Sequence, residues 1–63
     1  MANNLEIIER SLKDFIEIQK IMGLAKKENA PETYAELKEK YLYLKALLQT
    51  AGVNLSEIDR IKE

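Results

Sequence analysis

Side chains that could carry acid–base or nucleophilic chemistry are scarce in this chain of 63 residues. The sequence contains no His, no Cys, no Gly-rich phosphate loop and no nucleophile beside a base. The usual structural zinc site needs Cys or His, and carboxylate metal sites in helical bundles need Glu on inward faces. The pattern places every Glu on an outward face. We therefore expect that the protein is not an enzyme and has no catalytic residue, cofactor or metal.

A row of three Lys side chains is the first feature that suggests binding to a nucleic acid or an acidic partner. Lys13, Lys20 and Lys27 recur every seven residues and so line one outer edge of a helix. The Glu residues that flank this row are Glu6, Glu9 and Glu17. The 10 basic and 11 acidic residues give a net charge of −1, which predicts no general attraction to nucleic acid or to a membrane. We interpret the row as a solvated face.

The last third of the chain carries a second pattern that could bind DNA. Around Gly52, the apolar residues at fixed offsets are Leu47, Ala51, Val53, Ile58 and Ile61. In this spacing, residues 44–63 resemble the helix-turn-helix of bacterial repressors, in which the second helix reads DNA. The resemblance implies DNA contacts by Asn54, Ser56, Arg60 and Lys62. Leu48 departs from the pattern, because a small residue there usually lets the two helices approach closely.

The same residues also fit a simpler interpretation, in which Gly52 caps one helix and Asn54 begins another. A recognition helix gains affinity by neutralising phosphate charge. The candidate helix would expose three acidic side chains and two basic ones, namely Glu57, Asp59, Glu63, Arg60 and Lys62. The sequence therefore favours the simple cap, and DNA binding stays as the alternative.

Two further kinds of residue could serve a partner. Gln19 lies near the middle of an apolar helix face. It could pair with its symmetry mate in a dimer, or it could lie at a rim or bond to a tyrosine hydroxyl. Tyr34 and Tyr41 are expected in the core with their hydroxyl groups at its edge. Tyr43 points away from these two, beside Leu47, and could anchor a partner protein.

A first helix is predicted over about residues 4–27, and it carries the row of three Lys residues and Gln19. At about 100° per residue its apolar side chains fall on one side. They are Leu5, Ile7, Ile8, Leu12, Phe15, Ile16, Ile18 and Met22. Asn3 with Glu6 has the spacing of a capping box at the helix start. Gly23 could end this helix, but we favour continuation through it, with close approach of another backbone as the reason for the Gly.

A second helix is predicted over about residues 31–51. Pro31 suits a first helical turn, and Asn29 with Glu32 repeats the capping-box spacing. Apolar residues then recur three and four apart, as in paired helices, at Tyr34, Leu37, Tyr41, Leu44, Leu48 and Ala51. A weaker stripe consists of Ala35, Leu42 and Ala46. With few residues between them, the two helices should form an antiparallel hairpin.

A short third helix is predicted over about residues 55–62. Asn54 would be its N-cap, and Glu57 would complete a capping box. Val53 with Ile58 has the spacing of a hydrophobic staple. The side chains expected to face inward are Leu55, Ile58 and Ile61. We expect this helix to fold against the open end of the hairpin.

Together these elements predict an all-α fold in a single helical domain, residues 1–63. A core of this size rarely supplies more than roughly 3–5 kcal/mol, so a small domain usually needs a further source of stability. Because the chain has no Cys or His for a disulfide or a zinc site, self-association is the source that remains. The apolar face of the first helix is also wider than one partner helix covers. We therefore expect a homodimeric four-helix bundle. Its dimer or partner interface is predicted at Ile7, Phe15, Ile18, Gln19, Met22, Leu42, Tyr43, Ala46 and Leu47.

The function expected from these observations is protein–protein interaction, as an adaptor, inhibitor or regulatory subunit. The alternatives are a small helix-turn-helix DNA-binding regulator that uses residues 44–63, and a structural component of a phage or mobile-element assembly. No apolar run is long enough to span a bilayer, and the first ten residues lack the basic and apolar regions of a signal peptide. A cytoplasmic setting is therefore expected.

Overall fold

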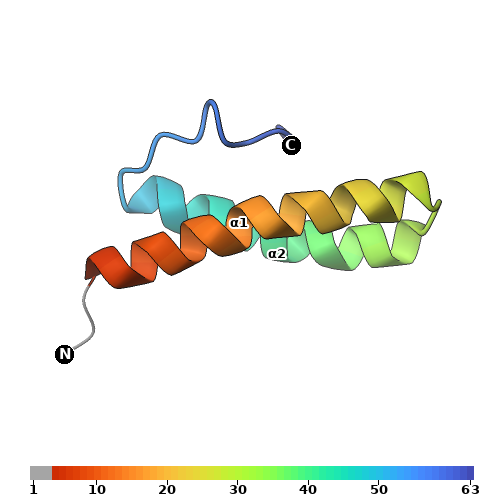
Figure 1. The fold of residues 1–63 in the computed structure, drawn as a ribbon, viewed down its shortest axis with the longest axis horizontal. Helices are drawn as coiled ribbons and strands as arrows, with labels where there is room; N and C mark the ends of the chain where they lie inside the picture. Colours follow the sequence, from red (N-terminus) through yellow and green to blue (C-terminus); the bar gives the residue numbers. More distant parts are fainter. Residues whose placement is uncertain (1–3) are drawn as a thin grey trace.

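The computed structural model describes residues 4–63 and is all-helical, with no strand in that range. Helix α1 (Asn4–Lys27) and helix α2 (Pro31–Thr50) run antiparallel as a hairpin (Figure 1). The strap, residues 53–63, returns along one side of this hairpin (Figure 1). The predicted all-α hairpin is confirmed. The capping box predicted at Asn3 lies outside the described residues.

The turn between the helices is set by Asn29, whose backbone is left-handed with a φ of 57°. Its N–H donates to the Lys26 carbonyl (3.1 Å), and the N–H of Ala30 donates to the Ala25 carbonyl (2.9 Å). These two bonds form a Schellman motif, which satisfies carbonyls at the end of α1. Ala30 is the N-cap of α2 and makes no side-chain cap bond. The predicted capping box of Asn29 with Glu32 is therefore wrong, because Asn29 closes α1 instead.

Gly23 lies inside α1, which continues through it to Lys27 as predicted. Among the described residues of the single chain the expected close approach does not occur, because a Cβ atom at position 23 would meet no heavy atom within 4 Å. Gly in a helix interior costs roughly 0.5–1 kcal/mol relative to Ala. The fold of the single chain therefore gains nothing from Gly23.

The end of α2 is set by Gly52, which has a φ of 86°. Its N–H donates to the Gln49 carbonyl (3.0 Å), and the N–H of Val53 donates to the Leu48 carbonyl (3.0 Å). This is a second Schellman motif, and Val53 packs against the core, a contact that frequently accompanies this motif. Gly52 is thus a helix cap, which is the simpler of its two predicted roles, and it turns the chain back into the strap.

The core lies between the two helices and under the strap. Its buried members are Phe15, Ile18, Met22, Tyr41, Leu44, Leu48 and Leu55. The rings of Phe15 and Tyr41 stack with their centroids 5.3 Å apart, which joins the middle of α1 to the middle of α2. The seam predicted on α2 faces this core from Tyr34 to Leu48, whereas its last member, Ala51, is exposed at the helix cap.

The prediction of a third helix over residues 55–62 is wrong. The strap forms a single turn, in which the N–H groups of Ile58 and Asp59 donate to the Leu55 carbonyl (3.0 and 2.7 Å). Beyond Asp59, the backbone N–H groups donate to side-chain oxygens instead of to carbonyls of the preceding turn. Because these side chains compete successfully for the donors, the turn does not continue as a helix.

Candidate functional site

The strap is held on the hairpin by two buried polar side chains, and the first is Gln19 of α1. Its Oε1 accepts hydrogen bonds from the N–H groups of Arg60 (2.6 Å) and Ile61 (3.2 Å). Its Nε2 donates to the carbonyls of Ile58 (3.1 Å) and Phe15 (3.3 Å). The predicted bond to a tyrosine hydroxyl is wrong. The amide is fully used within the chain, so it has no bond left for a symmetry mate.

The second anchor is Asp59 of the strap itself. The Tyr41 hydroxyl donates to Asp59 Oδ1 (2.6 Å), and the Lys45 ammonium lies 2.9 Å from Oδ2. The N–H of Lys62 also donates to Oδ1 (2.9 Å), and the N–H of Glu63 donates to the Tyr41 hydroxyl oxygen (3.2 Å). Asp59 is buried, so the exposed position expected for it on a third helix is wrong.

Two Lys side chains of α2 close over the end of the strap. Lys45 Nζ donates to the Glu63 backbone carbonyl (2.8 Å) and lies 5.7 Å from the centroid of the Tyr41 ring. Lys38 Nζ lies 3.0 Å from the Glu63 carboxylate. Exposed ion pairs contribute about 0–1 kcal/mol each, so the buried contacts of Asp59 matter more than the outer pair of Lys38.

The surroundings of this cluster shift the pKa values of three groups. Burial raises the pKa of Asp59, but the hydrogen bonds from Tyr41, Lys45 and the Lys62 N–H outweigh it, so the net pKa lies below the ordinary value. Burial and then the bond to Asp59 raise the pKa of Tyr41. The hydrogen bond to Asp59 raises the pKa of Lys45 against the opposing effect of desolvation. At neutral pH the cluster therefore holds a carboxylate, a neutral phenol and an ammonium group.

These polar groups bind each other and the strap. Within residues 4–63, every buried side-chain nitrogen or oxygen atom has a hydrogen-bond partner. In the same range no three carboxylates gather in a way that could hold a metal ion. What the cluster does chemically is fix the strap, so binding of another molecule has to be sought on the outer surface.

The nine residues predicted at a dimer or partner interface divide into two groups. Those buried inside the single chain are Phe15, Ile18, Gln19 and Met22. Those exposed or half-buried are Ile7, Leu42, Tyr43, Ala46 and Leu47. The buried group serves the core of one chain, and the outer group remains at its surface.

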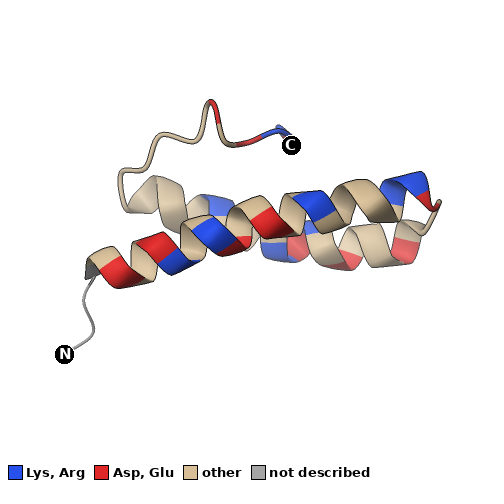
Figure 2. Cartoon of the chain, in the orientation of Figure 1, with Lys and Arg blue, Asp and Glu red and all other residues tan. Residues whose placement is uncertain are grey.

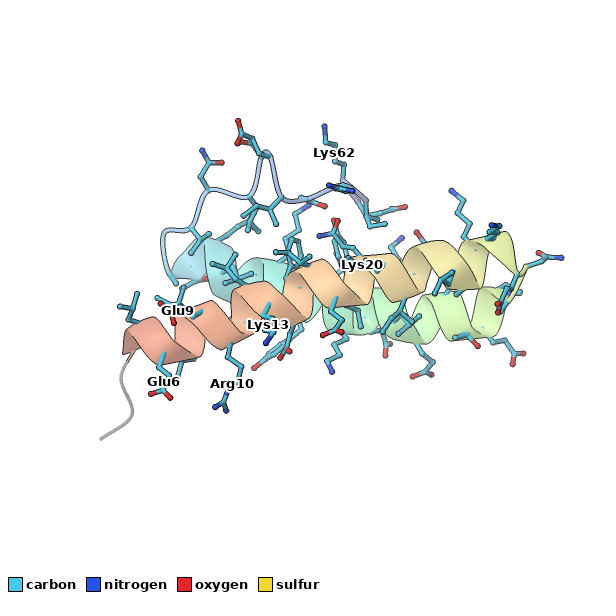
Figure 3. The ribbon with its side chains drawn as sticks, in the orientation of Figure 1. Glu6, Glu9, Arg10, Lys13, Lys20 and Lys62 are labelled. Atoms are coloured by element: carbon cyan, nitrogen blue, oxygen red, sulfur yellow. The ribbon has the colours of Figure 1, made fainter. Side chains whose placement is uncertain are left out.

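The residues predicted for DNA contact are all exposed on the strap, namely Asn54, Ser56, Arg60 and Lys62. The Asn54 side-chain oxygen accepts the Ser56 N–H (3.0 Å) and so caps one turn. Lys62 has a left-handed φ of 56°, and its side chain extends away from the hairpin (Figure 3). Since no helix follows Gly52 in the described chain, the second helix of a helix-turn-helix is not formed.

A groove that sequence reasoning missed lies between α1 and the strap. Its volume is about 480 Å³, and Ile16, Ile58 and Ile61 give it apolar walls. Gly23 lines it as well, together with Gln19 and the charged residues Lys20, Glu57 and Arg60. No local signal predicts this groove, because it exists only once the strap has folded back beside α1.

Comparison with protein-family models, curated proteins and solved structures finds no match to this chain. Across residues 4–63, neither helix combines the length and the apolar character that crossing a membrane requires. The fold therefore defines this protein only as a helical hairpin closed on one side by a strap. Its function has to be argued from the surface that the strap leaves open.

Proposed function

We propose that this chain is a small, non-catalytic protein-interaction module that associates with itself. The observation that carries the proposal is the apolar surface outside the closed hairpin. The large apolar side chains that are at least 43% exposed are Leu5, Ile7, Ile16, Ile21, Leu24, Leu42 and Tyr43.

The distribution of these side chains supports association better than their number does. Single exposed apolar residues are normal on soluble proteins, but a concentration on one surface marks an interaction site. Five of the seven lie on α1, and at about 100° per residue Leu5 and Ile16 share one side of that helix, whereas Ile7, Ile21 and Leu24 lie on other sides. Burying one such side chain fully stabilises by roughly 1.5–3 kcal/mol. Association of two hairpins would bring four helices together and add the stability that so small a core lacks.

The outer side of α2 offers a second surface, suited to a partner protein. Tyr43 is 65% exposed and Leu42 is 44% exposed, with the small Ala46 also exposed on that helix. Tyr is enriched where protein contacts are strongest, because it buries a large rigid ring at low entropic cost. An adaptor, inhibitor or regulatory subunit would use such a surface. A cytoplasmic setting stays a prediction, and nothing in the strap favours the DNA-binding alternative over this proposal.

Sedimentation equilibrium from micromolar to millimolar concentration tests self-association. The proposal predicts a mass that rises from 7.3 kDa toward twice that value. A mass that stays at 7.3 kDa at every concentration contradicts it. Ile16→Glu should weaken the association, whereas Thr33→Glu, at an exposed polar position of α2, is the matched control and should leave it unchanged.

A further inference from the structure

One side of α1 carries residues whose order is self-complementary. At about 100° per residue, six positions between residues 5 and 23 fall within about 80° of the helix circumference. They are Leu5, Glu9, Leu12, Ile16, Lys20 and Gly23. Leu5 is 61% exposed and Ile16 is 43% exposed, and Leu12 is half-buried. This side lies next to the groove between α1 and the strap, which Ile16, Lys20 and Gly23 line.

Read from its two ends toward the middle, this side matches large with small and acid with base. If a second α1 is laid antiparallel, with the twofold axis between positions 12 and 16, Leu5 falls opposite Gly23, and Glu9 falls one residue, about 1.5 Å along the axis, from the position opposite Lys20. A twofold contact has this property, because every residue pair then occurs twice with the roles exchanged. The middle of the contact would be aliphatic, with Leu12 facing Ile16.

Gly23 supplies independent support, because nothing within one chain requires a Gly there. A Cβ atom at position 23 would meet no heavy atom within 4 Å, and Gly is unfavourable in a helix interior compared with Ala. The open space above it continues into the groove of about 480 Å³ with its aliphatic walls of Ile16, Ile58 and Ile61. Because these walls are aliphatic, the space is suited to an aliphatic side chain of a second molecule, such as that of Leu5.

The charges of α1 favour the same antiparallel arrangement. Residues 4–15 carry three acidic and two basic side chains, namely Glu6, Glu9, Asp14, Arg10 and Lys13, and residues 16–27 carry one acidic and three basic ones, namely Glu17, Lys20, Lys26 and Lys27 (Figure 2). Glu9 and Lys20 lie on either side of the middle of α1, both exposed (Figure 3). Within the described chain, the recorded ion pairs use neither of them. Arg60 adds positive charge to the groove and Glu57 negative charge.

We infer that the partner on α1 is a second copy of this chain, docked antiparallel with its Leu5 over Gly23 and its Glu9 beside Lys20. This inference rests on the proposed self-association and names the surface and the register of it. Charge reversal tests the register directly. Glu9→Lys and Lys20→Glu should each raise the dimer dissociation constant on the order of tenfold, because two attractive pairs become repulsive. The combined variant, with both reversals in one chain, should restore the dimer.

The measurement is sedimentation equilibrium at low ionic strength, where charge pairs are least screened. Arg10→Glu and Glu17→Lys, which make the same charge changes on another side of α1, are the matched controls and should have little effect. Gly23→Leu should abolish the dimer by filling the space that Leu5 of the second copy needs, and circular dichroism would confirm that the helices remain.

The outcomes separate the two proposals. A wild-type dimer that ignores both reversals, or a combined variant no tighter than the single ones, overturns this register and leaves the self-association standing. A wild-type chain that stays at 7.3 kDa up to millimolar concentration removes the proposed self-association and this inference with it. A weaker dimer on each reversal and its recovery in the combined variant would support the register.

Discussion

At the scale of single residues, Gln19 and Asp59 fix the path of the strap. Gln19 Oε1 accepts two consecutive backbone N–H groups, and Asp59 accepts a third at Lys62. One such bond adds only about 0.5–1.5 kcal/mol of net stability, but a buried donor left without an acceptor costs roughly 1–3 kcal/mol. Removal of either acceptor would therefore leave partly buried donors of the strap without a partner, and in this way Gln19 and Asp59 set its path.

Tyr41 and Tyr43 form a matched pair for testing this cluster. Tyr41→Phe removes the hydroxyl that donates to the Asp59 carboxylate, and bonds to charged groups are worth roughly 1.5–3 kcal/mol. The variant should lose about that much free energy of unfolding in urea. Tyr43→Phe removes an exposed hydroxyl and should change the value by less than about 0.5 kcal/mol. Equal effects of the two substitutions would contradict the role given to Tyr41.

Acid should loosen the strap through Asp59. Its pKa in the folded chain lies below the ordinary value of about 3.9, so below that pH the unfolded chain binds more protons than the folded one. The stability that Asp59 contributes is therefore complete above pH of about 4 and is lost as the pH falls through the folded pKa. Urea unfolding measured at a series of pH values would show this loss.

Asp59→Asn provides the control for the acid prediction. The Asn side chain cannot ionise, so the ion pair with Lys45 is lost. The variant should therefore be less stable than the wild-type chain at neutral pH. Its stability should also fall less steeply between pH of about 4 and 2. An unchanged acid dependence in this variant would show that the loss comes from other carboxylates.

At the scale of the elements, local pattern predicts the helices and fails for the strap. The bounds of α1 and α2 follow from apolar residues three and four apart and from Pro31, all of which are local signals. The strap has equally good local signals for a helix, in Asn54 and Glu57. The strap nevertheless does not form a helix, because Gln19 and Tyr41, which lie 22 or more residues away in sequence, supply oxygens that accept its backbone N–H groups. Gln19 in an apolar face was the one visible sign of such an acceptor.

The two Gly residues should respond in opposite directions to the same substitution. Gly23→Ala adds a good helix former where nothing obstructs it, so the monomeric chain should gain roughly 0.5–1 kcal/mol. Gly52→Ala forces an L side chain into a φ of 86° and should cost roughly 1–2 kcal/mol. Thermal unfolding at low concentration would measure both. Loss of stability in Gly23→Ala would mean that position 23 is crowded within the chain.

At the scale of the whole molecule, the strap closes one side of the hairpin and leaves others open. The buried core draws on both helices and on Leu55, while most of the exposed large apolar side chains remain on α1. Neither the groove nor this division into covered and open sides could be predicted from the sequence, because both depend on where the strap lies. The surface proposed for self-association therefore lies beside the groove that α1 and the strap form together.

Methyl nuclear magnetic resonance spectra recorded from dilute to concentrated solution test whether the chain self-associates through the side of α1 that carries Leu5 and Ile16. Self-association through this side should shift the methyl signals of Leu5 and Ile16 with concentration, while those of the buried Leu48 and Leu55 stay fixed. Methyl signals that remain unchanged at every concentration, or that shift only at residues of α2, would contradict it.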